Sequence, residues 1–240
     1  ASKTMQENNE KGSVAFFSLE MSSEQLSTRI LSEQARISSS EIRRGKASEE
    51  TLNRYIETSR NIYDLPLYID ETPAIAISTL SNRARRIKRL FGLKLIVVDY
   101  IQLMRTNSNR MDGRVQEISE ITQGLKALAK ELNVPVVALS QLSRAVEQRD
   151  DKIPQLSDLR ESGSIEQDAD VVLFVYREQY YLEKKEPKQG SIEHAEWQSK
   201  MSDIHGLASL ILGKHRHGST GTVHVEFEGM YTKFKDLSKN

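Results

Sequence analysis

Short apolar runs alternate along the chain with segments whose apolar residues recur at helical spacing. The runs predict buried strands over Val14–Phe17, Lys94–Asp99, Pro135–Ser140 and Val171–Tyr176, and a short strand over Leu67–Ile69. The helical segments begin at a capping box at Ser22 and at Glu49, Ser78 and Val115. Strands that are separated by helices indicate a mainly parallel sheet with crossover connections.

The last part of the chain follows a different pattern. Leu207–Leu212 and Thr222–Phe227 flank a glycine-containing turn, which predicts an antiparallel hairpin at one edge of the sheet. Residues 178–205 are highly charged, include Trp197 and separate two strands, so we expect a surface insertion with a short helix. The sequence therefore predicts a single α/β domain over residues 1–240, with helices flanking a twisted sheet.

Composition narrows the classes of function. Thirty-four basic and 34 acidic residues give no net charge, so a site for a polyanion has to be local. The absence of cysteine excludes disulfides, thiolate metal sites and thiol nucleophiles, and it fits a cytoplasmic protein. No apolar run approaches the roughly 18 residues that span a bilayer, and no signal peptide is visible, so we expect no membrane partner. The basic side of the helix from Ser78 to Phe91 is interpreted as a solvated face.

Polar side chains follow three of the predicted strands, namely Glu20, Asp99 and Gln141. The carboxyl ends of parallel strands share one crevice, so these side chains are expected to converge. The set suits nucleotide hydrolysis, because an aspartate there holds Mg²⁺ through its water shell and a glutamate can accept a proton from water. Gln141 could hydrogen-bond a γ-phosphate. Each residue alone fits a structural role equally well, as a cap, an ion-pair partner or a donor to backbone groups.

Two further segments carry candidate anion-binding groups. Lys214 and Arg216 are two residues apart at a strand end, so both side chains should project to the same side. They either reach a phosphate, which can belong to a neighbouring subunit, or simply decorate an exposed turn. Arg160 and Gly163 lie in a polar loop before a predicted helix start at Ser164. That loop either binds phosphate without reading bases or neutralises its own charges.

Taken in order, five stretches closely resemble the C-terminal motor domain of the DnaB-type replicative helicases of bacteria. They are FFSLEMSSEQL, LIVVDYIQLM, VPVVALSQLSRAVEQR, SDLRESGSIEQDADVVLFVYR and GKHRHGSTGTVHVEF, and the resemblance covers the chain from Gly12 to Leu237. It implies a RecA-like fold in a ring of six identical subunits, which hydrolyses ATP with Mg²⁺ while it moves along single-stranded DNA. It also implies primase and a helicase loader as partners of the full-length protein.

The resemblance assigns roles to individual residues. It implies that Glu20 activates water, that Asp99 belongs to the Mg²⁺ site and that Gln141 senses the γ-phosphate. It places Arg29 near the nucleotide, and it makes Lys214 and Arg216 the basic pair that a neighbouring subunit inserts into the site. The loop that contains Arg160, Glu161 and Gly163 then contacts the DNA backbone in the central channel.

The chain departs from the family pattern in two respects. The phosphate loop is absent, because too few residues separate Ser2-Lys3-Thr4 from the first strand for the helix that must follow such a loop. The N-terminal helical domain is missing as well. We therefore expect a motor domain with its phosphate loop upstream of residue 1, inactive alone. The alternatives are a non-catalytic RecA-like ring or adaptor subunit, and a recombinase relative with the same core.

Overall fold

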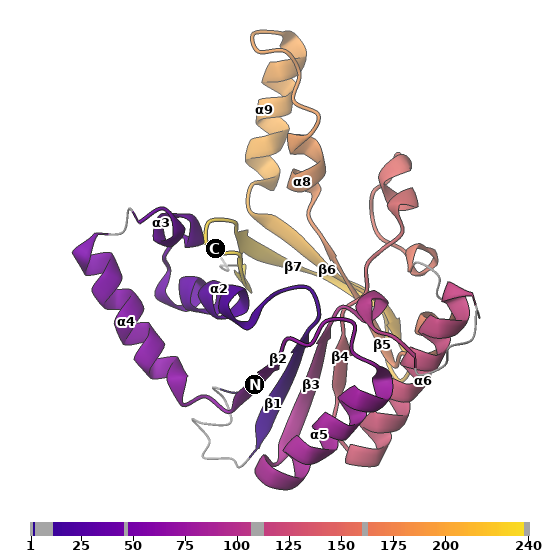
Figure 1. Cartoon of the computed structure of the whole chain (residues 1–240). Coiled ribbons are helices and arrows are strands. Elements are labelled where there is room, and N and C mark those ends of the chain that lie inside the picture. The colour runs from indigo at the N-terminus through magenta and orange to yellow at the C-terminus, as the bar shows by residue number, and fades with distance from the viewer. Residues whose placement is uncertain (1, 3–11, 46–47, 107–112, 160–162, 238–240) are drawn as a thin grey trace. The chain divides into compact units, whose positions relative to one another are not determined.

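The computed structural model describes residues 2, 12–45, 48–106, 113–159 and 163–237 (Figure 1). Contacts between residues divide the chain into two compact units. The first comprises Ala1–Gln141 and Leu159–Ala169, and the second comprises Leu142–Asp158 and Asp170–Asn240. No helix in the described part of the chain is both long and apolar enough to cross a membrane.

The first unit contains a four-stranded parallel sheet. Its strands are β1 (Ser13–Ser18), β2 (Leu67–Asp70), β3 (Leu93–Asp99) and β4 (Val136–Ala138), in the order β2-β1-β3-β4. Phe17, Ile96 and Val98 are fully buried, as expected for apolar runs in the middle of a covered sheet. The parallel sheet predicted from the sequence is confirmed.

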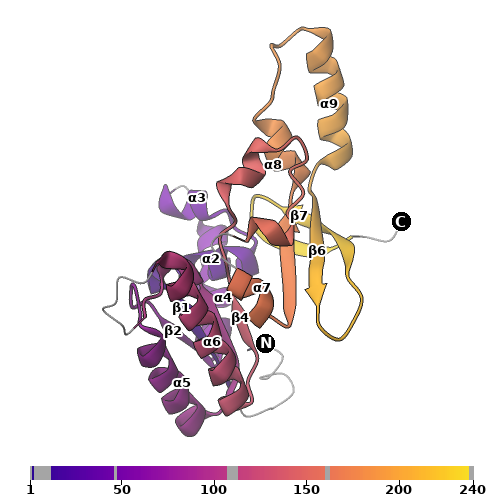
Figure 2. The ribbon, with the colours of Figure 1, turned by 90° about the vertical axis from the view of Figure 1, so that its right-hand side faces the viewer.

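Helices connect the strands of this unit or follow the last of them. They are α2 (Ser23–Ala35), α3 (Ser39–Arg43), α4 (Glu49–Tyr63), α5 (Ile77–Phe91), the short η1 (Ile101–Leu103), α6 (Arg114–Leu132) and α7 (Gly163–Asp168). Helix α5 packs on β1 and β3 and lies beside α6, as Figure 2 shows. Leu80 of α5 and Ile121 of α6 are fully buried, so the apolar faces that gave the helical period in the sequence form this core.

The second unit contains a four-stranded antiparallel sheet. Its strands are β5 (Val171–Tyr176), β6 (Leu207–His215), β7 (Gly221–Glu228) and β8 (Lys233–Asp236), paired in chain order. The short helices η2 (Arg144–Gln148) and η3 (Leu156–Asp158) belong to the loop that precedes it. The predicted hairpin is confirmed as β6 and β7, and the sheet extends beyond it on both sides.

Two helices, α8 (Glu178–Glu183) and α9 (Ile192–Ile204), follow β5 where the sequence predicted one short helix. They lie side by side and project beyond the ends of β5 and β6 in both ribbon views (Figures 1 and 2). The indole N–H of Trp197 donates to the carbonyl of Leu182 at 2.9 Å and ties the two helices together. The tryptophan among charged residues thus serves as an internal contact of this helical pair.

Two strands that we predicted as buried are partly exposed. In β4 and directly after it, Val137 is 51% exposed and Leu139 is 41% exposed. Among the described residues β4 pairs only with β3, so it is the edge of its sheet. In β5, Val172 and Phe174 are buried whereas Leu173 is exposed. An apolar run does not reveal whether one face or both faces of a strand are covered, and this is why the prediction was wrong.

Candidate functional site

Glu20 and Asp99 lie at the carboxyl ends of neighbouring parallel strands. Ser18, the last residue of β1, is opposite Asp99, the last residue of β3, and the N–H of Leu19 donates to the Asp99 carbonyl at 2.8 Å. Glu20 follows directly and is exposed. Partial burial raises the pKa of Asp99, the negative charge of Glu20 raises it further, and the Arg29 guanidinium opposes both effects. Glu20, Asp99 and Arg29 therefore form one electrostatic cluster.

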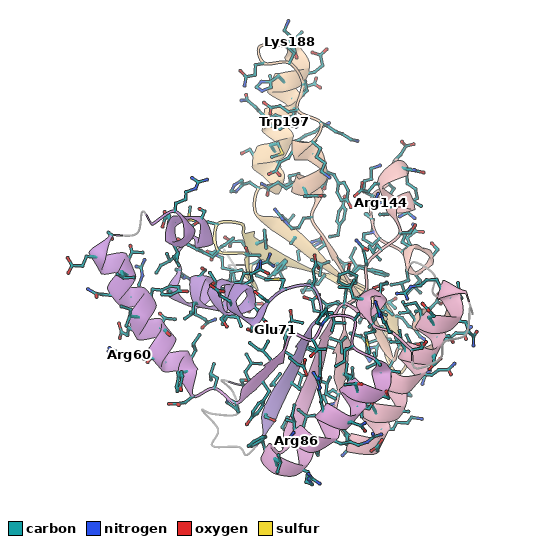
Figure 3. All side chains as sticks on the ribbon, in the orientation of Figure 1. Arg60, Glu71, Arg86, Arg144, Lys188 and Trp197 are labelled. Atoms are coloured by element: carbon teal, nitrogen blue, oxygen red, sulfur yellow. The ribbon has the colours of Figure 1, made fainter. Side chains whose placement is uncertain are left out.

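Local hydrogen bonds fix the turn that carries Glu20. The Ser18 hydroxyl donates to the Met21 carbonyl at 2.7 Å. Ser22 caps α2 reciprocally with Gln25, as the capping box predicts. The N–H of Ser23 donates to the carboxylate of Glu71, which is labelled in Figure 3. Glu20 therefore lies in a short turn that hydrogen bonds fix on both sides.

Gln141 follows β4, the neighbour of β3 in the same sheet. Its N–H donates to Oε1 of Gln102 at 3.2 Å, and Nε2 of Gln102 donates to the Gln141 carbonyl at 3.3 Å and to the Ser140 hydroxyl at 2.9 Å. Gln102 thus holds the backbone of Gln141 through both the oxygen and the nitrogen of its side-chain amide, while Gln141 itself is exposed. Gln102 was not predicted from the sequence, although it lies only three residues after Asp99.

The structure therefore brings Glu20, Asp99 and Gln141 to one edge of one sheet, with Arg29 beside the two acids. Among the described residues no three histidine, aspartate or glutamate side chains group as a complete metal cluster. The donor set still fits a hydrated Mg²⁺, because a partly buried carboxylate next to a second carboxylate carries negative charge that a cation would relieve. One carboxylate with several waters is a usual arrangement for this ion.

Lys214 and Arg216 lie at the end of β6 in the second unit. Lys214 pairs with Val172 but Leu212 pairs with Leu173, so Gly213 is the extra residue of a β-bulge. A bulge turns the residues after it to the opposite face of the sheet, so Lys214 faces away from the side that Leu212 occupies. The N–H of Arg216 donates to the Asp170 carbonyl at 2.8 Å, and its guanidinium pairs with the Asp170 carboxylate at 3.1 Å.

Of the three DNA contacts predicted in the loop before α7, the structure describes only Gly163. Arg160 and Glu161 lie outside the described residues. Gly163 is the first residue of α7, which packs on α6 and is held there by a 2.6 Å hydrogen bond from the Thr122 hydroxyl to Asp168. An added Cβ at Gly163 would meet no atom within 4 Å, so space alone does not explain the glycine.

Comparison with known proteins decides the family. The model of the DnaB-like helicase C terminal domain matches residues 1–236. The chain belongs to this family. The replicative DNA helicase DnaB of Rickettsia typhi is 54% identical over 237 residues, which are 99% of this chain and 48% of that protein. DnaB of Geobacillus stearothermophilus is 43% identical over 226 residues, which are 94% of this chain and 46% of that protein. The chain thus spans about half the length of these relatives.

The fold agrees with this assignment. A solved structure of a DnaB-like replicative helicase, described with its interactions with primase, superposes with a TM-score of 0.83 at 33% identity. The match covers 99% of this chain and 53% of that one. The predicted RecA-like α/β fold, with its parallel sheet and its antiparallel strands, is therefore confirmed.

Proposed function

We propose that this chain is the motor domain of a replicative DNA helicase, which couples ATP hydrolysis to movement along single-stranded DNA and to unwinding. The observation that carries the proposal is the convergence of Glu20, Asp99 and Gln141 at the carboxyl edge of the parallel sheet. This edge is where open α/β sheets bind their ligands. Membership of the DnaB-like family supports the same assignment.

Each of these residues has a task in the proposed reaction. Glu20 is exposed at the end of a fixed turn, so it can accept a proton from the attacking water. Asp99 would hold Mg²⁺ through water, and the bound ion would supply positive charge to the phosphates. Gln141, held through its backbone by Gln102, presents an amide that can donate to a γ-phosphate. Arg29 adds positive charge beside the two acids.

The remaining groups act between molecules in this proposal. Lys214 and Arg216 of one protomer reach the nucleotide of its partner in a ring of six, and the bulge at Gly213 sets the face from which they project. The loop with Arg160, Glu161 and Gly163 contacts the phosphates of single-stranded DNA. Primase and a helicase loader are proposed partners of the longer protein, and the structural neighbour described with primase supports the first of these.

A phosphate cradle is missing from these 240 residues, because no Gly-Lys-Thr or Gly-Lys-Ser sequence occurs among them. We therefore propose that the chain alone hydrolyses little or no ATP. The test is to incubate the purified chain with ATP and Mg²⁺ and to measure the phosphate that is released. Turnover that is abolished by Glu20→Ala would contradict this part of the proposal, while turnover unaffected by that change points to a contaminating enzyme.

Strand displacement tests the function itself. The chain is extended with the residues that flank the matched half in the Rickettsia typhi relative, and this protein is called the extended chain below. We expect it to separate a forked DNA duplex when ATP and Mg²⁺ are present. ATP-independent binding to DNA without separation would instead favour the non-catalytic ring or adaptor subunit.

A further inference from the structure

The segments that follow β3 and β4 stay joined beyond the end of the parallel sheet. The last registered pair of these two strands is Val98 and Ala138. Past this pair, the N–H of Leu139 donates to the Val98 carbonyl at 2.9 Å, and the N–H of Ile101 donates to the Leu139 carbonyl at 3.0 Å. Asp99 lies between Val98 and Ile101 in the chain, so the backbone on both sides of this acid is tied to the end of β4.

Gln102 adds a further link to this connection with its side chain. Its Oε1 accepts the N–H of Gln141, and its Nε2 donates both to the Gln141 carbonyl and to the Ser140 hydroxyl. A backbone N–H can only donate, so the N–H of Gln141 fixes which end of the amide is the oxygen. Three hydrogen bonds from one side chain to two adjacent residues hold the Gln141 backbone against rotation as well as displacement.

Gln102 itself has little freedom to move. It is the central residue of η1, and Ile101 and Met104 on either side of it are each only 1% exposed. The N–H of Met104 donates to the Ile101 carbonyl at 3.0 Å, and the Gln102 carbonyl accepts from the guanidinium of Arg114, the first residue of α6. Because its backbone is already fixed, the Gln102 side chain loses little entropy when it holds Gln141.

We propose that Gln102 is a positioning residue that sets the preference of the site for a nucleoside triphosphate over a diphosphate. The inference rests on the proposed function, which gives Gln141 the contact to the γ-phosphate. Gln102 does not have to touch the nucleotide. Without it, the backbone that carries Gln141 would have to be ordered whenever a triphosphate binds, which weakens that binding. A diphosphate has no γ-phosphate and is unaffected.

Hydrogen exchange tests the clamp in the 240-residue chain without nucleotide. In Gln102→Met, which keeps the length of the side chain but not its amide, the N–H of Gln141 should exchange faster than in the parent chain, while the N–H of Ile96 in β3 keeps its protection. Gln123→Met is the matched control, because Gln123 is an exposed glutamine whose amide donates to Ser119 of the same helix. Equal exchange of the Gln141 amide in Gln102→Met and the parent would overturn the inference.

Nucleotide binding to the extended chain tests the consequence. The Kd is measured for ADP and for a non-hydrolysable ATP analogue, each with Mg²⁺. Gln102→Met should weaken binding of the analogue about tenfold, which is the size of one hydrogen bond to a charged group, and should leave binding of ADP unchanged. Gln102→Asn should have the same effect, because its amide is one methylene shorter. If Gln102→Met does not fold, Gln102→Asn serves for both measurements.

A double-mutant cycle separates positioning from a general structural role. Gln141→Ala removes the proposed γ-phosphate contact, so it should weaken binding of the analogue at least as much as Gln102→Met does. If Gln102 acts through Gln141, adding Gln102→Met to Gln141→Ala should cause no further loss. A further loss of about tenfold would show that Gln102 acts independently of Gln141, and it would overturn the inference.

The outcomes separate the inference from the proposed function. If Gln141→Ala weakens binding of the analogue and Gln102→Met does not, the inference fails and the proposed function stands. The inference also fails if Gln102→Met weakens binding of ADP and of the analogue equally, or if Gln123→Met has the same effect as Gln102→Met. If Gln141→Ala leaves binding of the analogue unchanged, the proposed γ-phosphate contact fails and the inference fails with it.

Discussion

Asp99 lies partly buried beside Glu20 at the carboxyl ends of β3 and β1, and both burial and the charge of Glu20 raise its pKa. Two carboxylates placed in this way destabilise the folded chain when both are ionised. Such an arrangement is typical of a site that is completed by a cation, and it supports the proposal that this edge of the sheet binds a nucleotide with Mg²⁺.

Replacement of Asp99 should therefore stabilise the chain at neutral pH. The pKa of Asp99 in the folded state is raised above the ordinary value of 3.8, so its ionisation favours unfolding. Below pH 3.8 the group is protonated in both states and has no effect. The unfavourable effect develops as the pH rises through that value and is complete above the folded pKa. We expect Asp99→Asn to raise the Tm at neutral pH and to leave it unchanged at acidic pH, as measured by thermal unfolding.

Asp70, at the end of β2, provides a control of opposite sign. Burial opposes its ionisation, but hydrogen bonds from Arg83 and Thr72 prevail and lower its pKa below 3.8. Asp70→Asn should lower the Tm at neutral pH, and the loss should shrink as the pH falls through the folded pKa. A lower Tm for Asp99→Asn at neutral pH would contradict the account of that residue.

A side chain at Gly213 should destabilise the fold. A Cβ there would lie 2.6 Å from Cε2 of Phe174, which is buried, so the ring or the bulge has to move. We expect Gly213→Ala to lower the free energy of unfolding by about 1–3 kcal/mol, as overpacking does. Gly221→Ala is the matched control, because an added Cβ at Gly221 meets nothing within 4 Å. Denaturant unfolding measures the stability of both variants. Equal stability of Gly213→Ala and Gly221→Ala would refute the claim that Gly213 is needed to avoid a clash with Phe174.

Arg216 should act on the site of a neighbouring protomer. In the extended chain, Arg216→Ala should reduce ATP turnover by about 10³-fold or more, as the loss of an arginine finger does. Mixing Arg216→Ala with Glu20→Gln protomers should restore part of the activity, because some sites then combine an intact Glu20 with an intact Arg216. Full ATP turnover by Arg216→Ala alone would exclude the role of an arginine finger. If the mixture turns over no more ATP than the two variants do separately, action between protomers is excluded.

The sequence predicted the strand ends well because the strands before them are short apolar runs that give way to polar residues within a few positions. Glu20, Asp99 and Gln141 could be assigned to one edge from parallel topology alone. The β-bulge at Gly213 could not be predicted, because an unpaired residue becomes visible only when the register of both strands is known. The sequence gives the spacing of Lys214 and Arg216 but not the face from which they project.

The hydrogen bonds of Gln102 and Arg149 could not be predicted from the sequence either. Gln102 holds Gln141 across 39 residues of chain, and Arg149 holds Asp158 across nine. Polar residues in loops are normally solvated, so composition gives no sign that these two make several hydrogen bonds each. The exposure of Val137 was missed because an apolar run has the same appearance in an edge strand as in a central strand.

The most direct test of the account concerns Glu20 in the extended chain. If Glu20 accepts the proton from the attacking water, Glu20→Gln should abolish Mg²⁺-dependent ATP hydrolysis while a fluorescent ATP analogue binds with unchanged Kd, because the amide keeps the shape of the side chain but cannot act as a base. Single-turnover hydrolysis measured beside equilibrium binding gives both quantities. Hydrolysis at the parent rate in Glu20→Gln would contradict the assignment of this sheet edge as the catalytic centre.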